Sequence, residues 1–322
     1  MKVVAALGGN AILHPGEKGT AAEQLRVVEE TAEHLADLVV SGVDLVITHG
    51  NGPQVGRLLL QNEAGAHPEE GSPVEPVPAM PLDVLVAETQ GQIGYMLQIA
   101  LDNALRRRGS RKPVASLLTQ VIVDANDPAF SNPTKPIGPL YSHARARRIS
   151  GTTGVLFVEV GGGKWRRVVP SPKPLRFVEE DTIRAVGAEG VLLVVSGGGG
   201  IPVVEVEGRG QRCLRGVEAV VDKDLSAELL ARLLGADLLL ILTDVEAVYL
   251  EFGTPQACAI GRMSLDEARE LLATGRFPEG SMGPKFQAAV GFVAGGGGRA
   301  AITSLARAAD AVWGDAGTQV VS

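Results

Sequence analysis

The stretch Val3-Val-Ala-Ala-Leu-Gly-Gly-Asn10 is a short apolar run that ends in two glycines and an asparagine. An apolar run without alternating polar residues is typical of a strand that is buried on both faces. A helical pattern follows over residues 21–41, and Gly42 ends it before a second apolar run at Asp44-Leu-Val-Ile-Thr48. A strand, a helix and a strand in this order indicate two parallel strands with a helix across one face.

The same alternation continues along most of the chain. It predicts further helices at 53–63 and 84–108, and further strands at 114–118, 191–195 and 238–242. Unalternated apolar strands that are separated by helices need cover on both faces of their sheet. The sequence therefore predicts an α/β protein in which helices pack on both sides of a parallel sheet.

One segment interrupts this rhythm. Residues 119–174 are rich in proline, glycine and arginine, and the runs at 155–160 and 165–169 are joined through three glycines in the manner of a β-hairpin. We interpret 119–174 as a small subdomain inserted in the main sheet, because long irregular excursions in compact domains are often lids or binding loops. The proline-rich stretch 65–81 is expected to be an exposed connection.

Composition argues against several classes of function. The 322 residues are 45% hydrophobic, which indicates a globular protein of one large or two ordinary domains. With 37 acidic against 30 basic residues and only 4% aromatic residues, the chain is a poor candidate for binding nucleic acid. No apolar run approaches the length of a membrane span, and the N-terminal run is too short for the core of a signal peptide. Two cysteines without CxxC or metal-ligand spacing fit a reducing compartment, so we expect a cytoplasmic protein.

Four predicted strands end in small or polar residues, at 8–10, 49–52, 196–200 and 243–244. In doubly wound sheets, ligands bind at the carboxyl ends of the strands, and glycine there lets the backbone approach an anion. Together the four ends favour a phosphate or carboxylate cleft over the alternative, in which they are only tight turns. Neither a Walker A sequence nor a GxGxxG opening the first helix occurs, so phosphate chemistry would use another architecture.

Two lysines, Lys223 and Lys285, open helical patterns, where the partial positive charge of a helix start disfavours a cation. A phosphate shared by both lysines would reverse the sign of this effect. Asp224 could lie between them, where a carboxylate would orient both side chains and keep them charged. The alternative is that Asp222 and Asp224 cap one helix while Lys285 points to water.

Two other side chains could also act in a cleft. Lys135 lies in Pro133-Thr-Lys-Pro-Ile-Gly138, where the flanking prolines could hold it out from the inserted subdomain. A solvated loop lysine is the more common alternative. His49 follows a strand and could be a general base, although a structural histidine held by hydrogen bonds is the more common case.

Strings spread along the chain match a known family in order and type. They lie at residues 8–11, 48–56, 81–83, 90–91, 93–95, 127–130, 133–138, 166–174, 197–202, 221–224 and 280–285. The sequence resembles the carbamate kinases, which are members of the amino-acid kinase family. The glycine loops are shared by the wider family, whereas Pro133-Thr-Lys-Pro-Ile-Gly138 and Pro170-Ser-Pro-Lys-Pro174 are more specific to carbamate kinases.

The resemblance implies a three-layer αβα sandwich around a mostly parallel sheet, with a small protruding subdomain. Residues 1–215 would form the acceptor-binding part, with 119–174 as a lid, and residues 216–322 would form the ATP-binding part. A homodimer is implied as well. These boundaries and the dimer come from the resemblance alone.

The resemblance also assigns roles to residues of this chain. The acceptor and the transferring phosphate would lie against Gly9, Asn10, Gly50, Asn51 and Gly52. Lys135 would reach the acceptor, while Lys223 and Lys285 would neutralise phosphate charge and Asp224 would organise both lysines. The nucleotide would contact Gly8, Gly199, Gly200, Thr243, Asp244, Tyr249 and Met282.

The implied reaction is reversible transfer of a phosphoryl group between ATP and carbamate, giving ADP and carbamoyl phosphate. The resemblance favours flux toward ATP in arginine or related catabolism, with Mg²⁺ carried on the ATP phosphates and no protein ligand assigned to it. Carbamate is already an anion, so it needs no strong general base. Two alternatives stay open: another amino-acid kinase with a different small acceptor, or a non-catalytic sensor of nucleotide or carbamoyl phosphate.

Overall fold

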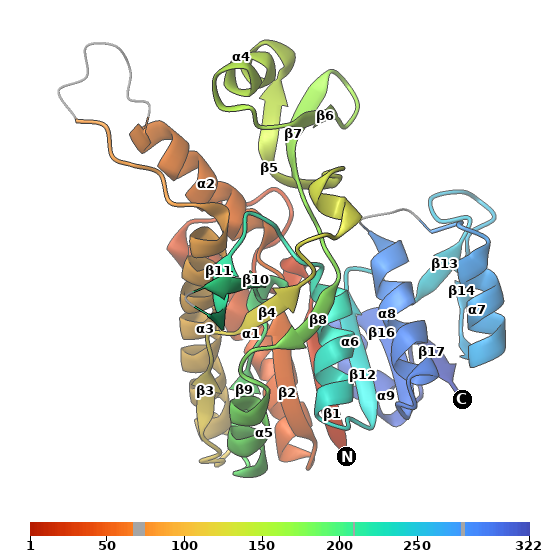
Figure 1. The fold of residues 1–322 in the computed structure, drawn as a ribbon. Helices are drawn as coiled ribbons and strands as arrows, with labels where there is room; N and C mark the ends of the chain where they lie inside the picture. Colours follow the sequence, from red (N-terminus) through yellow and green to blue (C-terminus); the bar gives the residue numbers. More distant parts are fainter. Residues whose placement is uncertain (67–74, 209, 278–280) are drawn as a thin grey trace.

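The computed structural model describes residues 1–66, 75–208, 210–277 and 281–322. The predicted connection 65–81 and the string 280–285 fall partly outside these residues, and 75–81 are exposed. The central sheet has the order β15-β17-β16-β12-β1-β2-β9-β3 (Figure 1). Its strands are β1 (Lys2–Leu7), β2 (Asp44–His49), β3 (Val114–Ser116), β9 (Leu192–Val194), β12 (Leu238–Thr243), β15 (Arg262–Ser264), β16 (Arg299–Ser304) and β17 (Thr318–Val321).

Neighbouring strands of this sheet run parallel, except that β16 and β17 are antiparallel. The predicted strands at 3–7, 44–48, 114–118, 191–195 and 238–242 all occur, with ends shifted by up to two residues. Their side chains alternate between two buried clusters, one on each face of the sheet. The mostly parallel sheet expected from the unalternated apolar runs is therefore confirmed.

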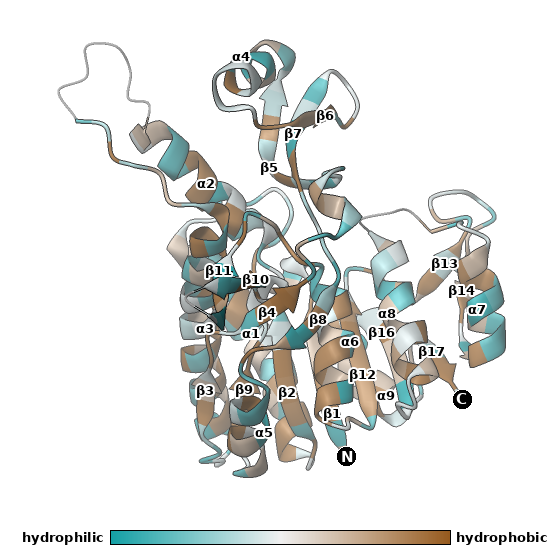
Figure 2. Ribbon diagram, viewed as in Figure 1, coloured by the Kyte–Doolittle hydropathy of each residue, from teal (hydrophilic) through white to brown (hydrophobic). Residues whose placement is uncertain are grey.

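Helices cover both faces and complete three layers. One cluster joins the sheet to α1 (Ala21–Val40), α3 (Leu82–Arg107) and α9 (Ala308–Trp313). The other cluster includes side chains from α5 (Glu180–Ala188), α6 (Lys223–Leu233), α7 (Leu265–Ala273) and α8 (Met282–Ala294). Figure 2 shows apolar residues concentrated in the central strands and hydrophilic residues on the outer helix α7. Each fully buried leucine or valine contributes roughly 1.5–3 kcal/mol to this core.

The predicted helices form with small changes at their ends. Helix α1 begins where predicted because Thr20 and Glu23 form a capping box, in which each side chain accepts a hydrogen bond from the other residue's backbone N–H. The helix predicted at 53–63 is α2 (Gly52–Ala66), and the one predicted at 84–108 is α3.

A second sheet, ordered β11-β10-β4-β8, lies beside the central sheet. It comprises β4 (Gln120–Val123), β8 (Pro174–Phe177), β10 (Ile201–Gly208) and β11 (Gln211–Gly216). A small hairpin pairs β13 (Val248–Leu250) with β14 (Cys258–Ile260). These strands were not predicted from the sequence, because their pairing depends on other strands that are distant along the chain.

A small unit protrudes from the body at the end where the parallel strands finish (Figure 1). It contains β5 (Lys135–Ser142), α4 (His143–Thr153), β6 (Phe157–Glu159) and β7 (Lys164–Val169), and we call residues 135–169 the protruding subdomain. The predicted hairpin is present as the antiparallel pair β6 and β7. Strand β4, at the start of the predicted segment 119–174, pairs instead with β8 and β10 in the second sheet.

The protruding subdomain is anchored on α2. Val55 and Leu59 of α2 pack with Ile137 and Val169 in a separate apolar cluster. A Cβ atom on Gly56 would lie only 2.7 Å from the Cα of Gly138, so the two backbones meet in near contact. The subdomain thus sits on a tightly packed base at the edge of the predicted cleft.

Among the described residues, no helix combines the length and apolarity that a membrane span requires. A division into parts at residues 1–215 and 216–322 stays a prediction.

Candidate functional site

Sheet topology brings the four predicted strand ends together. Strands β12, β1, β2 and β9 are consecutive neighbours and all run parallel, so the residues that follow them lie along one edge of the sheet. The amide of Gly8 donates to the carbonyl of Leu242, and that of Gly50 donates to the carbonyl of Leu7, both at 3.0 Å. These bonds carry the sheet pairing into the glycine turns.

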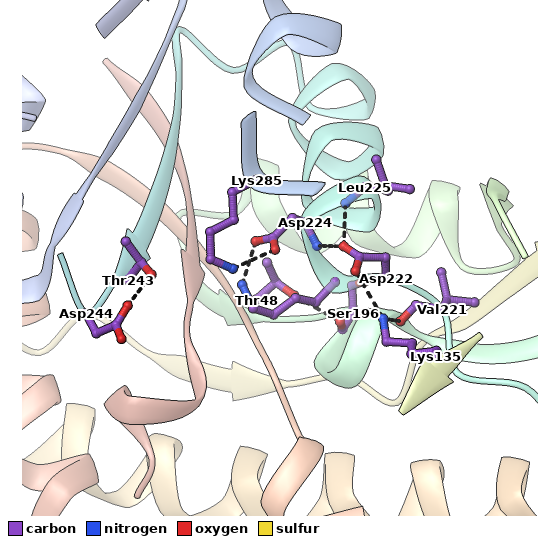
Figure 3. Close-up of polar contacts among 11 residues, drawn as sticks. Thr48, Lys135, Ser196, Val221, Asp222, Asp224, Leu225, Thr243, Asp244 and Lys285 are labelled. Carbon is purple, nitrogen blue, oxygen red and sulfur yellow. Dashed lines mark hydrogen bonds and ion pairs between the residues drawn. The ribbon is translucent and has the colours of Figure 1, made fainter. Parts of the chain in front are cut away.

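Helices α6 and α8 point their first turns at this edge and bring the two predicted lysines together. The Lys223 ammonium group is 2.6 Å from Oδ1 of Asp224, and the Lys285 ammonium group is 2.9 Å from Oδ2 of the same carboxylate. Figure 3 shows Lys285 reaching toward Asp224. The side chains of Lys223 and Asp224 are 14% and 4% exposed, so this cluster lies largely out of water.

The electrostatics of the cluster favour an anion. Burial alone would raise the pKa of Asp224, but the two lysines outweigh it and lower the pKa to about 2. Burial lowers the pKa of Lys223, and attraction to Asp224 opposes this change. Two ammonium groups and one carboxylate leave an excess of positive charge in a poorly solvated place. An anionic ligand would compensate that charge.

Helix capping accounts for only part of the local pattern. Oδ1 of Asp222 accepts hydrogen bonds from the backbone N–H groups of Asp224 and Leu225, so Asp222 caps α6. Asp224 binds the lysines, and Lys285 contacts Asp224. The alternative in which both aspartates cap the helix and Lys285 points to water is therefore wrong.

Glycine allows the turns to pack closely around this cluster. A Cβ atom on Gly50 would lie 3.2 Å from Cδ of Lys223, tighter than ordinary contact. Gly198 has a φ of +65°, and a Cβ there would overlap the side chain of Asn51. Asn51 itself is buried and donates from Nδ2 to the hydroxyl of Thr89 at 2.9 Å. Gly9 and Asn10 lie in a short 3₁₀ turn after β1, and Gly52 begins α2.

The loop after β9 is held in an unusual conformation. Ser196 has a φ of 57° and a ψ of 32°, a left-handed region that is unfavourable for residues other than glycine. The hydroxyl of Thr48 donates to the carbonyl oxygen of Ser196 at 2.9 Å, and the amide of Ser196 donates to the hydroxyl of Thr119 at 3.1 Å. Gln90 fixes the next residue by donating to the carbonyl of Gly197 at 2.9 Å. Strain that is held by so many partners is typical of a functional site.

Lys135 extends from the base of the protruding subdomain to the start of α6. Its ammonium group is 3.0 Å from Oδ2 of Asp222 and 3.5 Å from the carbonyl oxygen of Val221 (Figure 3). The structure therefore places Lys135 beside the lysine cluster and not free in solvent.

The residues predicted to contact a nucleotide are more dispersed. Gly199 and Gly200 are buried, and a Cβ on Gly199 would lie 2.7 Å from the carbonyl oxygen of Val221. The hydroxyl of Thr243, the last residue of β12, donates to Asp244 at 3.0 Å (Figure 3). Tyr249 lies in β13 with its ring 5.9 Å from that of Phe252, and Met282 is the first residue of α8. These residues lie on several elements: the loop after β9, the end of β12, β13 and the start of α8.

His49 is placed as a structural histidine. It is 1% exposed, and its Nδ1 lies 2.9 Å from the carbonyl oxygen of Gly50, which identifies Nδ1 as the protonated nitrogen of the neutral ring. Burial lowers the pKa of His49 from 6.5 to about 4. The ring is therefore neutral at pH 7 and supports the turn by packing and hydrogen bonding.

The described part of the chain contains no group of three or more histidine, cysteine, aspartate or glutamate side chains arranged to hold a metal ion. Both oxygens of Asp224 bind lysines, and those of Asp222 bind backbone amides and Lys135. These donors do not fit a resident metal site.

The sequence matches the amino acid kinase family over residues 1–304. The chain belongs to the amino acid kinase family. Its relatives within that family include the carbamate kinase of Thermococcus kodakarensis, 50% identical over 99% of both chains, and that of Pyrococcus furiosus, 47% identical over 99% of both chains. The solved structure of carbamate kinase from Giardia lamblia bound to AMP-PNP has a TM-score of 0.88 and 40% identity, covering 99% of this chain and 98% of that one. The predicted fold class and the resemblance to carbamate kinases are both confirmed.

Sequence reasoning missed several residues that shape this amino acid kinase site. Asp222 was considered only as a helix cap, and the support that Thr48, Thr89, Thr119 and Gln90 give to the loops was not predicted. Asp222 stands directly before Lys223, which could have indicated its role. The spacing of the other four residues did not indicate their contacts, because each partner is distant in the sequence.

The buried neutral His49 predicts a dependence of stability on pH. Its folded-state pKa of about 4 lies below the ordinary 6.5, so the unfolded chain takes up a proton first as the pH falls. The stability is intact above pH 6.5 and is lost toward pH 4, by about 3 kcal/mol for this residue. We expect the free energy of unfolding in urea to fall less between pH 7.5 and 4 in His49→Asn than in the wild type. The exposed His34→Asn is the control, and equal pH slopes for His49→Asn and the wild type would contradict the assignment.

Proposed function

We propose that the chain transfers a phosphoryl group reversibly between ATP and carbamate, giving ADP and carbamoyl phosphate. The observation that carries this proposal is the pair of buried ammonium groups on Asp224, at 2.6 and 2.9 Å, beside the glycine turns. The relatives that share 50% and 47% of its residues over nearly full length bear the name carbamate kinase. The acceptor is inferred from these relatives, and the phosphate chemistry from the cluster.

The cluster suits a reaction between two anions. ATP and carbamate repel each other, so the enzyme must neutralise phosphate charge and align the attacking oxygen with the leaving oxygen. Lys223 and Lys285 would bind oxygens of the migrating group, and Asp224 would hold both in place. With a pKa of about 2, Asp224 stays ionised at neutral pH, and so low a pKa makes it too weak a base to take a proton efficiently. Carbamate needs none, because its oxygen already bears negative charge.

The protruding subdomain would supply the acceptor side. Lys135 would reach the acceptor from its base, and Gly9, Asn10, Gly50, Asn51 and Gly52 would line the turns beneath it. Residues 135–169 contain seven lysines and arginines and one acidic residue, Glu159, in a chain whose net charge is -7. A positive surface above the cleft would attract anionic substrates.

The nucleotide would lie on the side of the cluster formed by α6, α8 and the end of β12. We propose contacts with Gly8, Gly199, Gly200, Thr243, Asp244, Tyr249 and Met282. The Giardia relative was solved with AMP-PNP, which supports ATP and ADP as ligands. Mg²⁺ would arrive on the phosphates.

We further propose that the reaction runs toward ATP, as in arginine or related catabolism, and in the cytoplasm. Carbamoyl phosphate is a mixed anhydride, so transfer of its phosphoryl group to ADP is chemically favourable. Cys213 and Cys258 are both free and exposed, which fits a reducing compartment.

A coupled assay tests the function directly. We expect ATP to form from ADP and carbamoyl phosphate, at a rate that depends on Mg²⁺. Preference for glutamate, acetylglutamate or a nucleotide as acceptor would instead identify another amino-acid kinase. Calorimetry that shows tight ADP binding without any phosphate exchange would identify a non-catalytic sensor.

Replacing Lys285 tests the role of the cluster. We expect Lys285→Ala to lower turnover by at least about 10³, because the charge it places on the transition state is lost. The fold should remain, since Asp224 keeps its contact with Lys223. Turnover and thermal unfolding are measured beside Lys18→Ala, which removes an exposed lysine outside the cluster. Near-normal turnover in Lys285→Ala would exclude it from the chemistry.

We also propose a homodimer, joined through the edge of the central sheet at β3. This strand pairs with β9 on one side and ends the sheet order on the other. Tyr95 and Leu118 beside it are 65% and 59% exposed and line a groove between α3 and β3. An unpaired edge with large apolar side chains favours association with a second copy.

The mass in solution tests this dimer. Light scattering on the wild type should give twice the chain mass, and Tyr95→Lys with Leu118→Lys should shift the protein toward the monomer. The same change at an exposed apolar residue elsewhere, Leu214→Lys in β11, should leave the dimer intact. A monomeric wild type would contradict the proposal.

A further inference from the structure

Asp222 is a carboxylate that contacts both the start of α6 and Lys135, on two sides of the proposed reaction centre. Its Oδ1 accepts the backbone N–H of Asp224 at 2.9 Å and that of Leu225 at 3.4 Å. Its Oδ2 accepts a hydrogen bond from the ammonium group of Lys135 at 3.0 Å, across 87 positions of sequence. The two oxygens therefore connect different parts of the chain.

The first contact stabilises the N-terminus of the helix that carries Lys223 and Asp224. As the N-cap of α6, Asp222 orders the turn from which Lys223 and Asp224 project. Burial lowers the pKa of Lys223, and attraction to Asp222 is among the effects that raise it again. The nucleotide side of the centre thus needs a side chain at position 222 that caps α6.

The second contact fixes the position of the Lys135 ammonium group. Lys135 is the first residue of β5, and its backbone is paired with Val169 of β7. Its side chain would otherwise rotate freely, and the long lysine stem loses much rotamer freedom when it is held. The side chains of Lys135 and Asp222 are 25% and 18% exposed, so water screens the pair less than it would a surface pair.

We propose that Asp222 is a positioning residue, which orients Lys135 toward the anionic acceptor and ties it at a fixed separation from Lys223, Asp224 and Lys285. This inference rests on the proposed function, because it concerns the acceptor of that reaction. A lysine that is already ordered and charged binds the acceptor without first losing its freedom. Asp222 acts through Lys135 and does not itself contact the reacting atoms.

Serine at position 222 separates this role from helix capping. Serine is as good an N-cap as aspartate, but it has one short hydroxyl and cannot cap α6 and also hold Lys135. We expect Asp222→Ser to raise the KM for carbamoyl phosphate about tenfold, while the KM for ADP changes less than about twofold. Lys135→Met should have a similar effect. Lys18→Met, which removes an exposed lysine outside the protruding subdomain, is the control.

A double-mutant cycle decides whether the two residues act together. If Asp222 acts through Lys135, the variant with both changes has the same acceptor KM as Lys135→Met alone. An unchanged acceptor KM in Asp222→Ser, a decrease in that KM, or effects that multiply in the double variant would each overturn the proposal.

The same four proteins, unfolded in urea, test the contact without any turnover. Coupling between Asp222→Ser and Lys135→Met in the free energy of unfolding is expected, and strict additivity would also overturn the proposal. A wild type that binds ADP but transfers no phosphate would contradict the proposed function, and the unfolding cycle would still show whether Asp222 holds Lys135.

Discussion

Two ammonium groups, Lys223 and Lys285, share one buried carboxylate at the edge of the central sheet, and this contact governs much of the surrounding structure. A lysine at the start of a helix is unfavourable by roughly 0.3–1 kcal/mol, and burial adds to the difficulty of keeping it charged. Asp224 offsets both effects and keeps a pKa of about 2 because two cations face it. The cluster still carries an excess of positive charge, which favours an anionic ligand, and the described residues hold no group of side chains arranged for a metal ion.

The backbone turns around the cluster pack closely against its side chains. The turns that follow consecutive parallel strands lie along one edge of the sheet. Glycine at positions 50 and 198 allows the side chains of Lys223 and Asn51 to lie directly against the backbone there. Ser196, strained and held by threonines on two other segments, shows that the loop geometry is imposed by its surroundings. The rigid sheet edge therefore positions the charged side chains more precisely than a mobile loop could.

The protruding subdomain extends this arrangement to the side where we propose that the acceptor binds. It is fixed on α2 by close backbone contact and apolar packing, so Lys135 projects from a firm base. Its ion pair with Asp222 reaches the same helix that bears the cluster. Opposed anions need cations on both sides, and the chain supplies these from segments that are far apart in sequence.

Local sequence determined the strands β1, β2, β9 and β12, the long helices, the glycine turns and the positions of the lysines, because period, capping and glycine placement are properties of neighbouring residues. The strings that resemble carbamate kinases correctly indicated the family and the fold class. The second sheet was not predicted, since β4 and β8 have only four residues each and β10 and β11 are partly polar. Only the tertiary structure decided that Asp224 binds both lysines and that Asp222 holds Lys135, because the partners of a carboxylate depend on which groups lie near it in space. Those distances follow from how the layers pack around the sheet.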